Sequence, residues 1–189
     1  MEQALVLASV VLGVAIAFEL EHFNKVVRAK NVKWHWAQPL FATFVLLTML
    51  AFWWSVVSSA NGVDPQNGMS LGSFLPIMVM MILLALLAAV SFPDTIPEEG
   101  LDLAEYYQEN RVYQWSLFVA YFVIVHTGYV VRTVREASSL NDVLVVVPDS
   151  VALGLFALMI FARKWWQVAL GFAVFSFIPV VWATRLVLR

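Results

Sequence analysis

The chain has 189 residues, of which 62% are hydrophobic and 13% are charged, and its mean hydropathy is +0.83. A soluble domain is about half apolar and about a quarter charged, so this composition predicts a membrane protein. The net charge of -2 gives no indication of nucleic-acid binding, and a chain without cysteine excludes disulfides, thiol catalysis, iron–sulfur clusters and cysteine-ligated zinc.

Apolar runs of about 20 residues, the length that crosses a hydrocarbon core of about 30 Å, recur along the whole chain. Six of them fit, which predicts an all-α fold class: a polytopic membrane protein with a six-helix transmembrane bundle in a single domain. The first run has no Lys or Arg before it and no small-residue cleavage site after it, so we expect a retained span rather than a signal peptide. The predicted spans cover residues 3–21, 37–58, 70–92, 112–131, 143–161 and 165–187.

A cation-rich turn over residues 25–33 follows the first span, and an acidic segment over residues 93–111 follows the third. Asp102 followed by Glu105 resembles an N-terminal capping pair, so we expect a short surface helix within the acidic segment. A proline-containing sequence at residues 148–150 interrupts the fifth span and is compatible with two structures. In one, Asp149 caps a short helix that begins there after a partly extended or re-entrant segment; in the other, Asp149 is a carboxylate inside a kinked span.

Cations in short loops indicate the orientation of a membrane protein, because they are retained on the cytoplasmic side. Placing the turn after the first span and the acidic segment 93–111 inside gives seven cations inside and four outside, so both termini are predicted to lie outside. All eight tryptophans then fall near predicted span ends, where their amphipathic rings favour the headgroup level. The seven inner cations are Lys25, Arg28, Lys30, Lys33, Arg111, Arg163 and Lys164.

The pattern F-x-x-x-H-x-x-x-V-V-R occurs twice, at residues 18–28 and at residues 122–132. Two halves of three spans each have opposite orientations, so a true repeat would be an inverted repeat of the type found in many transporters. The alternative is chance similarity between apolar segments. The sequence is therefore compatible with two inverted three-helix repeats without requiring them.

Five ionisable residues in or near the spans are candidates for lining a transport path, because charge in a bilayer is costly and usually faces a bundle interior or a wet cavity. Glu19 and His22 share a helix face at i, i+3 spacing, as a proton-exchanging pair or half of a metal site requires; the alternative is an ordinary position at the headgroup boundary. No second Glu-x-x-His sequence occurs, so neither a metal site nor a cofactor is predicted. His126 is interpreted either as a packing histidine bonded to a hydroxyl or carbonyl, or as a titrating group. The five candidates are Glu19, Glu21, His22, His126 and Asp149.

Two classes of function fit this sequence best. The first is a small channel or transporter for protons, cations or a small solute, and the second is a non-catalytic membrane subunit, sensor or scaffold that docks a partner protein or anionic lipid. An intramembrane enzyme is a third class, but the sequence contains no recognisable nucleophile and base. The expected partners are the lipid bilayer and a homo-oligomer or larger membrane complex. Cations that either fix the topology or bind anionic headgroups are Lys25, Arg28, Lys30 and Lys33.

Several short motifs occur in the first two thirds of the chain. They are S-V-V-L-G at residues 9–13, Val32-Lys33, Phe52-Trp53-Trp54, Phe92-Pro93-Asp94, and Leu101-Asp102-Leu103 followed by Tyr106-Tyr107 and Asn110-Arg111. Together they resemble a widespread family of uncharacterised bacterial six-span inner-membrane proteins of about this length. The resemblance implies a six-span fold in a bacterial inner membrane and carries no chemistry. Members of the family often have a histidine near the position of Phe18, where this chain differs.

Overall fold

The structure is a computed structural model that describes residues 2–61 and 71–187 and is mostly helical. Five helices in these ranges are long and apolar enough to cross a membrane, which indicates a membrane protein, as the composition predicts. The chain forms two compact units, Met1–Tyr107 and Gln108–Arg189, which are described separately below. The five helices cover Val6–Arg28, Ala37–Ser58, Phe74–Ser91, Leu103–Glu136 and Asn141–Met159, and the sixth predicted span coincides with a further helix, Trp165–Val187.

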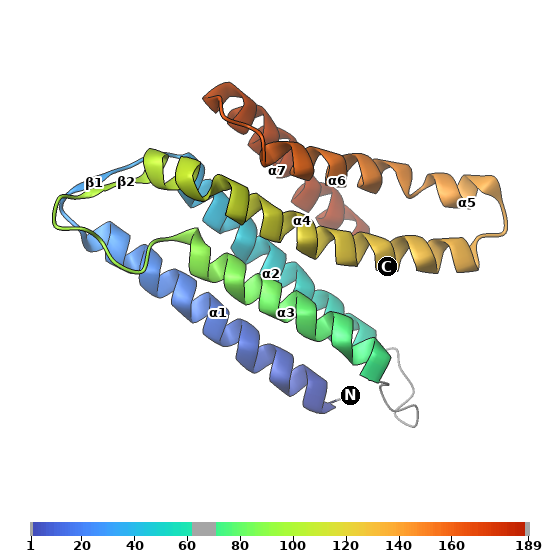
Figure 1. Ribbon diagram of the computed structural model, residues 1–189. Coiled ribbons are helices and arrows are strands. Elements are labelled where there is room, and N and C mark those ends of the chain that lie inside the picture. Colours follow the sequence, from blue (N-terminus) through green and yellow to red (C-terminus); the bar gives the residue numbers. More distant parts are fainter. Residues whose placement is uncertain (1, 62–70, 188–189) are drawn as a thin grey trace. The chain divides into compact units, whose positions relative to one another are not determined.

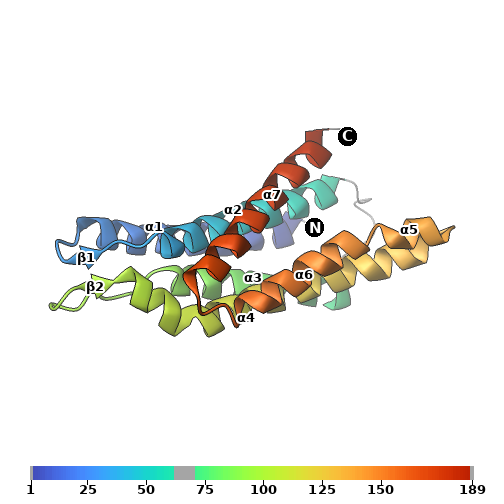
Figure 2. The same cartoon turned by 90° about the horizontal axis from the view of Figure 1, so that it is seen from above.

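The first unit consists of three helices that pack on one another: α1 (Glu2–Arg28), α2 (Ala37–Asn61) and α3 (Leu71–Ser91) (Figure 1, Figure 2). They run in alternating directions along a common axis. Their facing sides are apolar, and in a bilayer close packing of such sides, rather than escape from water, holds neighbouring helices together. Apolar side chains that are buried in these helices include Leu12, Phe41, Val45, Met49, Leu84 and Leu87.

A two-stranded parallel ladder connects the loops of the first unit, so the all-α prediction omits one small element. β1 (Val32–Lys33), in the cation-rich turn, pairs with β2 (Leu101–Asp102), in the acidic segment. Gly100 precedes β2 with φ at +108°, and a Cβ atom there would lie 2.6 Å from the carbonyl oxygen of Asn31, so only glycine fits. The cation-rich turn and the acidic segment therefore lie at the same end of the first unit.

An apolar cluster lies beside this ladder and joins α1, α2 and the start of α4 to the loop after α3. We call it the end cluster, and it closes the loop end of the first unit with side chains that exclude water. Its buried members are Val26, Ala42, Phe92 and Leu103, with Val32, Ile96 and Leu101 packed against them.

The helix α4 (Leu103–Glu136) is continuous, so the predicted surface helix and the fourth predicted span are one helix. Asp102 caps it as predicted, because its Oδ1 accepts the N–H groups of Ala104 at 2.9 Å and Glu105 at 3.3 Å. A helix of 34 residues is about 51 Å long, which exceeds a hydrocarbon core of about 30 Å. Its polar first turns therefore extend beyond the apolar part, and the boundary between the two units falls within it, after Tyr107.

The fifth predicted span consists of two helices, α5 (Leu140–Leu144) and α6 (Val147–Met159), in the second unit. The first sequence-based alternative, an extended or re-entrant segment before a helix capped by Asp149, is wrong. In agreement with the second, Asp149 lies inside an apolar helical span, residues 141–159, which is interrupted at residues 145–146. The residues before α6 form a two-residue turn with right-handed helical dihedral angles rather than an extended or re-entrant segment, and Val146 rather than Asp149 occupies the N-cap position. Pro148 lies in the first turn of α6, where its missing N–H needs no partner, so α6 begins there without losing a helical hydrogen bond.

Aromatic rings form the core of the second unit, between α4, α6 and α7 (Trp165–Val187). Phe156 of α6 stacks on Phe122 of α4, with ring centroids 4.6 Å apart, and on Phe175 of α7, with centroids 4.2 Å apart. Trp115 packs against two of these rings and is only 1% exposed. The ring is therefore part of the packed core of this unit and does not face headgroups.

A buried arginine holds the end of α6. Arg111 donates from Nε to the carbonyl oxygen of Ile160 at 3.0 Å and from Nη1 to Oε1 of Gln108 at 2.6 Å, and Gln108 in turn donates to the carbonyl oxygen of Arg163 at 3.3 Å. The last carbonyl groups of a helix lack partners within the helix and carry its negative dipole end. A guanidinium is well suited to this position, so Arg111, grouped with the topology cations above, has a structural role.

Candidate functional site

Glu19 and His22 lie on the buried face of α1. The helix continues beyond residue 21, the predicted end of the first span, to Arg28, so both side chains lie within the helix and not at its end. Glu19 is 1% exposed and His22 is 8% exposed. The i, i+3 spacing places them on the same side of α1, which packs against α2 and α3.

Glu19 is buried without a hydrogen-bond partner. Among the described residues, neither of its carboxyl oxygens accepts or shares a hydrogen bond. The hydroxyl of Ser91, which is also buried, lies close enough to act on Glu19, but it gives its single proton to the carbonyl oxygen of Leu87 at 2.9 Å, and turning it towards Glu19 would break that bond. An ionised carboxylate that lacks both donors and a cation is expensive to bury. The position favours exchange of a proton over a permanent charge.

His22 connects this buried position to a surface acid. Its Nε2 lies 3.4 Å from Oδ1 of Asp94, whose side chain is 79% exposed, while its Nδ1 is buried and has no hydrogen-bond partner within the described chain. A neutral imidazole has one donor and one acceptor nitrogen, and a protonated imidazole has two donors. A ring with one nitrogen at an exposed acid and the other free in the interior can therefore pass a proton between the two sides.

Three neighbouring polar residues, Asp94, Gln38 and Ser91, were not identified from the sequence. Gln38, fully buried in the first turn of α2, donates from Nε2 to the carbonyl oxygen of Ser91, and the Tyr106 hydroxyl donates to the carbonyl oxygen of Val90 at 3.1 Å. These bonds satisfy carbonyl groups in the last turn of α3. The sequence does contain a signal for Asp94. Pro93 cannot continue α3, so the residue that follows it lies at the end of that helix.

Apolar side chains enclose the Glu19–His22 pair along α1. Towards the loops lie the end cluster and Phe23, whose ring packs 5.4 Å from that of Phe92. Towards the N-terminus, the buried residues of α1 are small or aliphatic. In the described part of the first unit, Asp94 is thus the polar contact that leads from His22 to solvent. The buried α1 residues on the N-terminal side are Ala8, Leu12 and Ala15.

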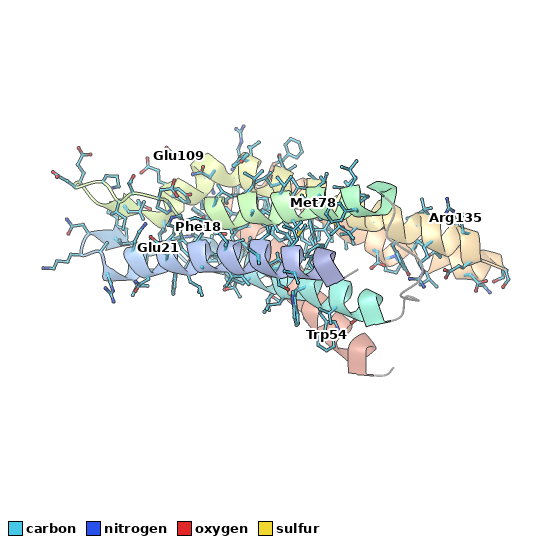
Figure 3. The ribbon with its side chains drawn as sticks, turned by 90° about the horizontal axis from the view of Figure 1, so that it is seen from below. Phe18, Glu21, Trp54, Met78, Glu109 and Arg135 are labelled. Carbon is cyan, nitrogen blue, oxygen red and sulfur yellow. The ribbon has the colours of Figure 1, made fainter. Side chains whose placement is uncertain are left out.

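Glu21 and the four candidate headgroup cations lie at the surface of the same end of the first unit. Glu21 pairs with Lys25 at 2.8 Å, and Lys33 lies 3.7 Å from Asp102. Figure 3 labels Glu21 on α1 and Trp54 on α2, which lie towards opposite ends of the three-helix unit. Two of the four cations therefore have acidic partners in the chain itself, while Arg28 and Lys30 are exposed.

His126 and Asp149 belong to the second unit. The Nε2 atom of His126 lies 3.0 Å from Oγ of Ser150, which also donates to the carbonyl oxygen of Val146 at 3.1 Å. This is the arrangement expected of a packing histidine bonded to a hydroxyl. Asp149 is half-buried in the first turn of α6, where a negative charge interacts favourably with the helix dipole. Neither unit on its own contains all five candidates.

In the described ranges, no group of three or more His, Asp or Glu residues is arranged to hold a metal ion. Comparison with protein-family models, with curated proteins and with solved structures finds no match to this chain. The candidate site in the first unit consists of Glu19, His22 and Asp94.

Proposed function

We propose that this protein is a small membrane transporter that carries protons, with Glu19 as the group that binds and releases them. The observation that supports the proposal is the Glu19 carboxyl group, which is 1% exposed and has no hydrogen-bond partner on either oxygen among the described residues. Such a group lowers the stability of the fold, and ionisable residues inside membrane spans commonly mark proton relays and ion pathways. A functional role explains why the chain carries it.

A proton suits this position better than a larger ion. Metal cations of the Ca²⁺ or Mg²⁺ type need about six oxygen ligands, whereas a proton needs one acceptor. The buried side chains of α1 on either side of Glu19 and His22 are apolar. The neighbouring polar side chains, Gln38 and Ser91, already donate to carbonyl groups of α3, so few oxygen ligands remain for a metal ion.

Transport by alternating access fits the surroundings better than an open channel. The polar contacts lead from Asp94 to His22, and the buried face of α1 beyond Glu19 is apolar. A proton on Glu19 would then need a conformational change to leave on the other side, as in transporters whose halves move against each other. The predicted inverted repeat remains part of this proposal.

Proton flux into liposomes tests the proposal. The purified protein is reconstituted with a trapped pH dye, and a membrane potential is imposed with K⁺ and valinomycin. The wild type and Glu21→Gln are expected to carry protons, whereas Glu19→Gln is not. Glu21→Gln is the matched control, because it makes the same chemical change at an exposed residue two positions away. Absence of wild-type flux, together with a stably co-purifying partner, would instead favour the docking subunit or scaffold.

The proposed orientation places both termini outside and Asp94 at the cytoplasmic face of a bacterial inner membrane. The chain has no cysteine, so Glu98→Cys introduces a single thiol in the same loop as Asp94. This thiol is expected to react with a membrane-impermeant reagent only when the cytoplasmic face is accessible. Reaction from the outer face would reverse the orientation.

A further inference from the structure

We infer that Asp94 is the entry group for the proton and that His22 relays it between Asp94 and Glu19. This inference rests on the proposed function and names the route by which the proton reaches the buried carboxyl group. Asp94 is a residue that the apolar periodicity of the spans does not single out, because it lies outside them.

The three side chains form a series from solvent to interior. The Asp94 side chain is 79% exposed, whereas His22 is 8% exposed and Glu19 is 1% exposed. Asp94 Oδ1 lies 3.4 Å from His22 Nε2, and Glu19 lies one turn along α1 from His22, about 4.5 Å along the helix axis. The order of exposure is thus the order in which a proton from water would meet the three groups.

The transfer conserves charge and atoms. The protonated carboxyl group of Asp94 gives its proton to Nε2 of His22, which forms an imidazolium and leaves an Asp94 carboxylate at the surface. The imidazolium then gives its Nδ1 proton to the Glu19 carboxylate, so Glu19 becomes neutral and His22 becomes the neutral tautomer with the proton on Nε2. Before the transfer His22 carries its proton on Nδ1. Rotation of the ring, or return of the proton by the same route, restores this starting tautomer.

The unpaired atoms lie where this route needs them. Nδ1 of His22 and both carboxyl oxygens of Glu19 are buried without partners in the described chain, so neither end of the inner transfer is occupied by another bond. Nδ1 and Glu19 do not bond each other at rest, so the inner step requires a rotation of one of the side chains. Groups with permanent partners would have to break a bond before each transfer.

Other charged and titratable groups around the site are already engaged. On α1, Glu21 is exposed and pairs with Lys25, and at the start of α4 the Tyr106 hydroxyl donates to a backbone carbonyl. The buried polar side chains contributed by α2 and α3 are the amide of Gln38 and the hydroxyl of Ser91, which do not titrate in the physiological range. These groups leave Asp94 as the acid in contact with His22.

Infrared spectroscopy of the full chain in lipid nanodiscs tests the route. The carbonyl stretch of a protonated carboxyl group reports Glu19, and its loss in Glu19→Gln assigns the band. After a pH jump from a photolabile proton donor, Asp94→Asn is expected to slow the rise of this band roughly tenfold without changing its final amplitude. This loss of rate is smaller than the roughly hundredfold or greater loss expected when a buried, positioned acid or base is removed, because water partly replaces an exposed group. Formate is expected to restore the rate in Asp94→Asn.

Glu98→Gln is the matched control, since it removes an exposed acid from the same loop and is expected to leave the rate unchanged. An unchanged rate in Asp94→Asn would overturn the entry role while the proposed function stands, provided that the wild-type band responds to pH. A reduced amplitude that formate does not restore would show that Asp94 only supports the local fold. A wild-type band that never responds to pH would overturn the proposed function together with the route.

Discussion

Replacing Glu19 with methionine should make the protein more stable and, at the same time, abolish proton transport. Methionine has nearly the same length and volume as glutamate, so the packing contacts of the site are retained. It has no oxygen atoms that need donors. The substitution therefore removes the unsatisfied polar group while changing little else.

The size of the gain follows from the burial of Glu19. In mutational data, burying a polar group without a hydrogen bond costs about 1–3 kcal/mol. Glu19 is 1% exposed, so nearly all of this cost applies. For a chain of this length, each kcal/mol shifts the unfolding midpoint by about 2–4 °C, which gives an expected rise of roughly 2–12 °C. Glu19→Gln should gain less, because its amide is still a buried polar group.

Thermal unfolding of the detergent-solubilised protein, followed by far-UV circular dichroism and tryptophan emission, measures this shift, and liposome flux measures the loss of activity. Glu21→Met is the matched control and should change the midpoint little, because this residue is exposed. A lower midpoint for Glu19→Met would refute the reasoning, since it would mean that the carboxyl group forms stabilising bonds and that Glu19 is a structural residue.

Three further predictions concern other parts of the fold. Gln38→Leu should destabilise the protein by about 1–3 kcal/mol in denaturant unfolding, because it leaves the buried carbonyl group of Ser91 without its donor. Arg111→Lys should raise hydrogen exchange in the α6–α7 turn by about fivefold or more, measured by mass spectrometry, because one ammonium cannot replace both guanidinium bonds; unchanged exchange would assign the turn's rigidity to packing alone. Burial lowers the pKa of His35 from its usual 6.5, so its stabilising contribution is present above pH 6.5 and lost as pH falls through the lower, folded pKa. The protection factor of the amides in the α1–α2 turn, the intrinsic exchange rate divided by the observed rate, should therefore fall on acidification below pH 6.5, when the ring nitrogen that accepts the Ala37 N–H is protonated, and His35→Gln should remove this pH dependence.

Local patterns in the chain identify most of the helices and one of their ends. In a bilayer every backbone polar group must be satisfied within its own segment, so an apolar run of about 20 residues has essentially one solution, a helix. The cap at Asp102 is also local, because its carboxylate needs only the N–H groups of the next turn. The shared face of Glu19 and His22 follows from helical spacing alone.

Hydropathy does not predict where α1 ends. It measures the affinity of a segment for lipid, whereas a helix can continue into water beyond its apolar part. Beyond the predicted end at residue 21, the exposed pair of Glu21 and Lys25 supports another turn at i, i+4 spacing. For the same reason hydropathy does not show where α4 begins: its polar first turns, before the predicted span at residue 112, are as helical as its apolar part.

The residue pattern alone therefore indicates a membrane protein, the approximate positions of its helices and the residues that share a face. The packing of the helices is needed to show that Glu19 is buried without a hydrogen bond, that His22 lies beside Asp94, and that the cation-rich turn pairs with the acidic segment. Periodicity places a side chain on one side of a helix, but what lies opposite depends on residues from segments far apart in the chain. Those contacts arise only when the helices pack.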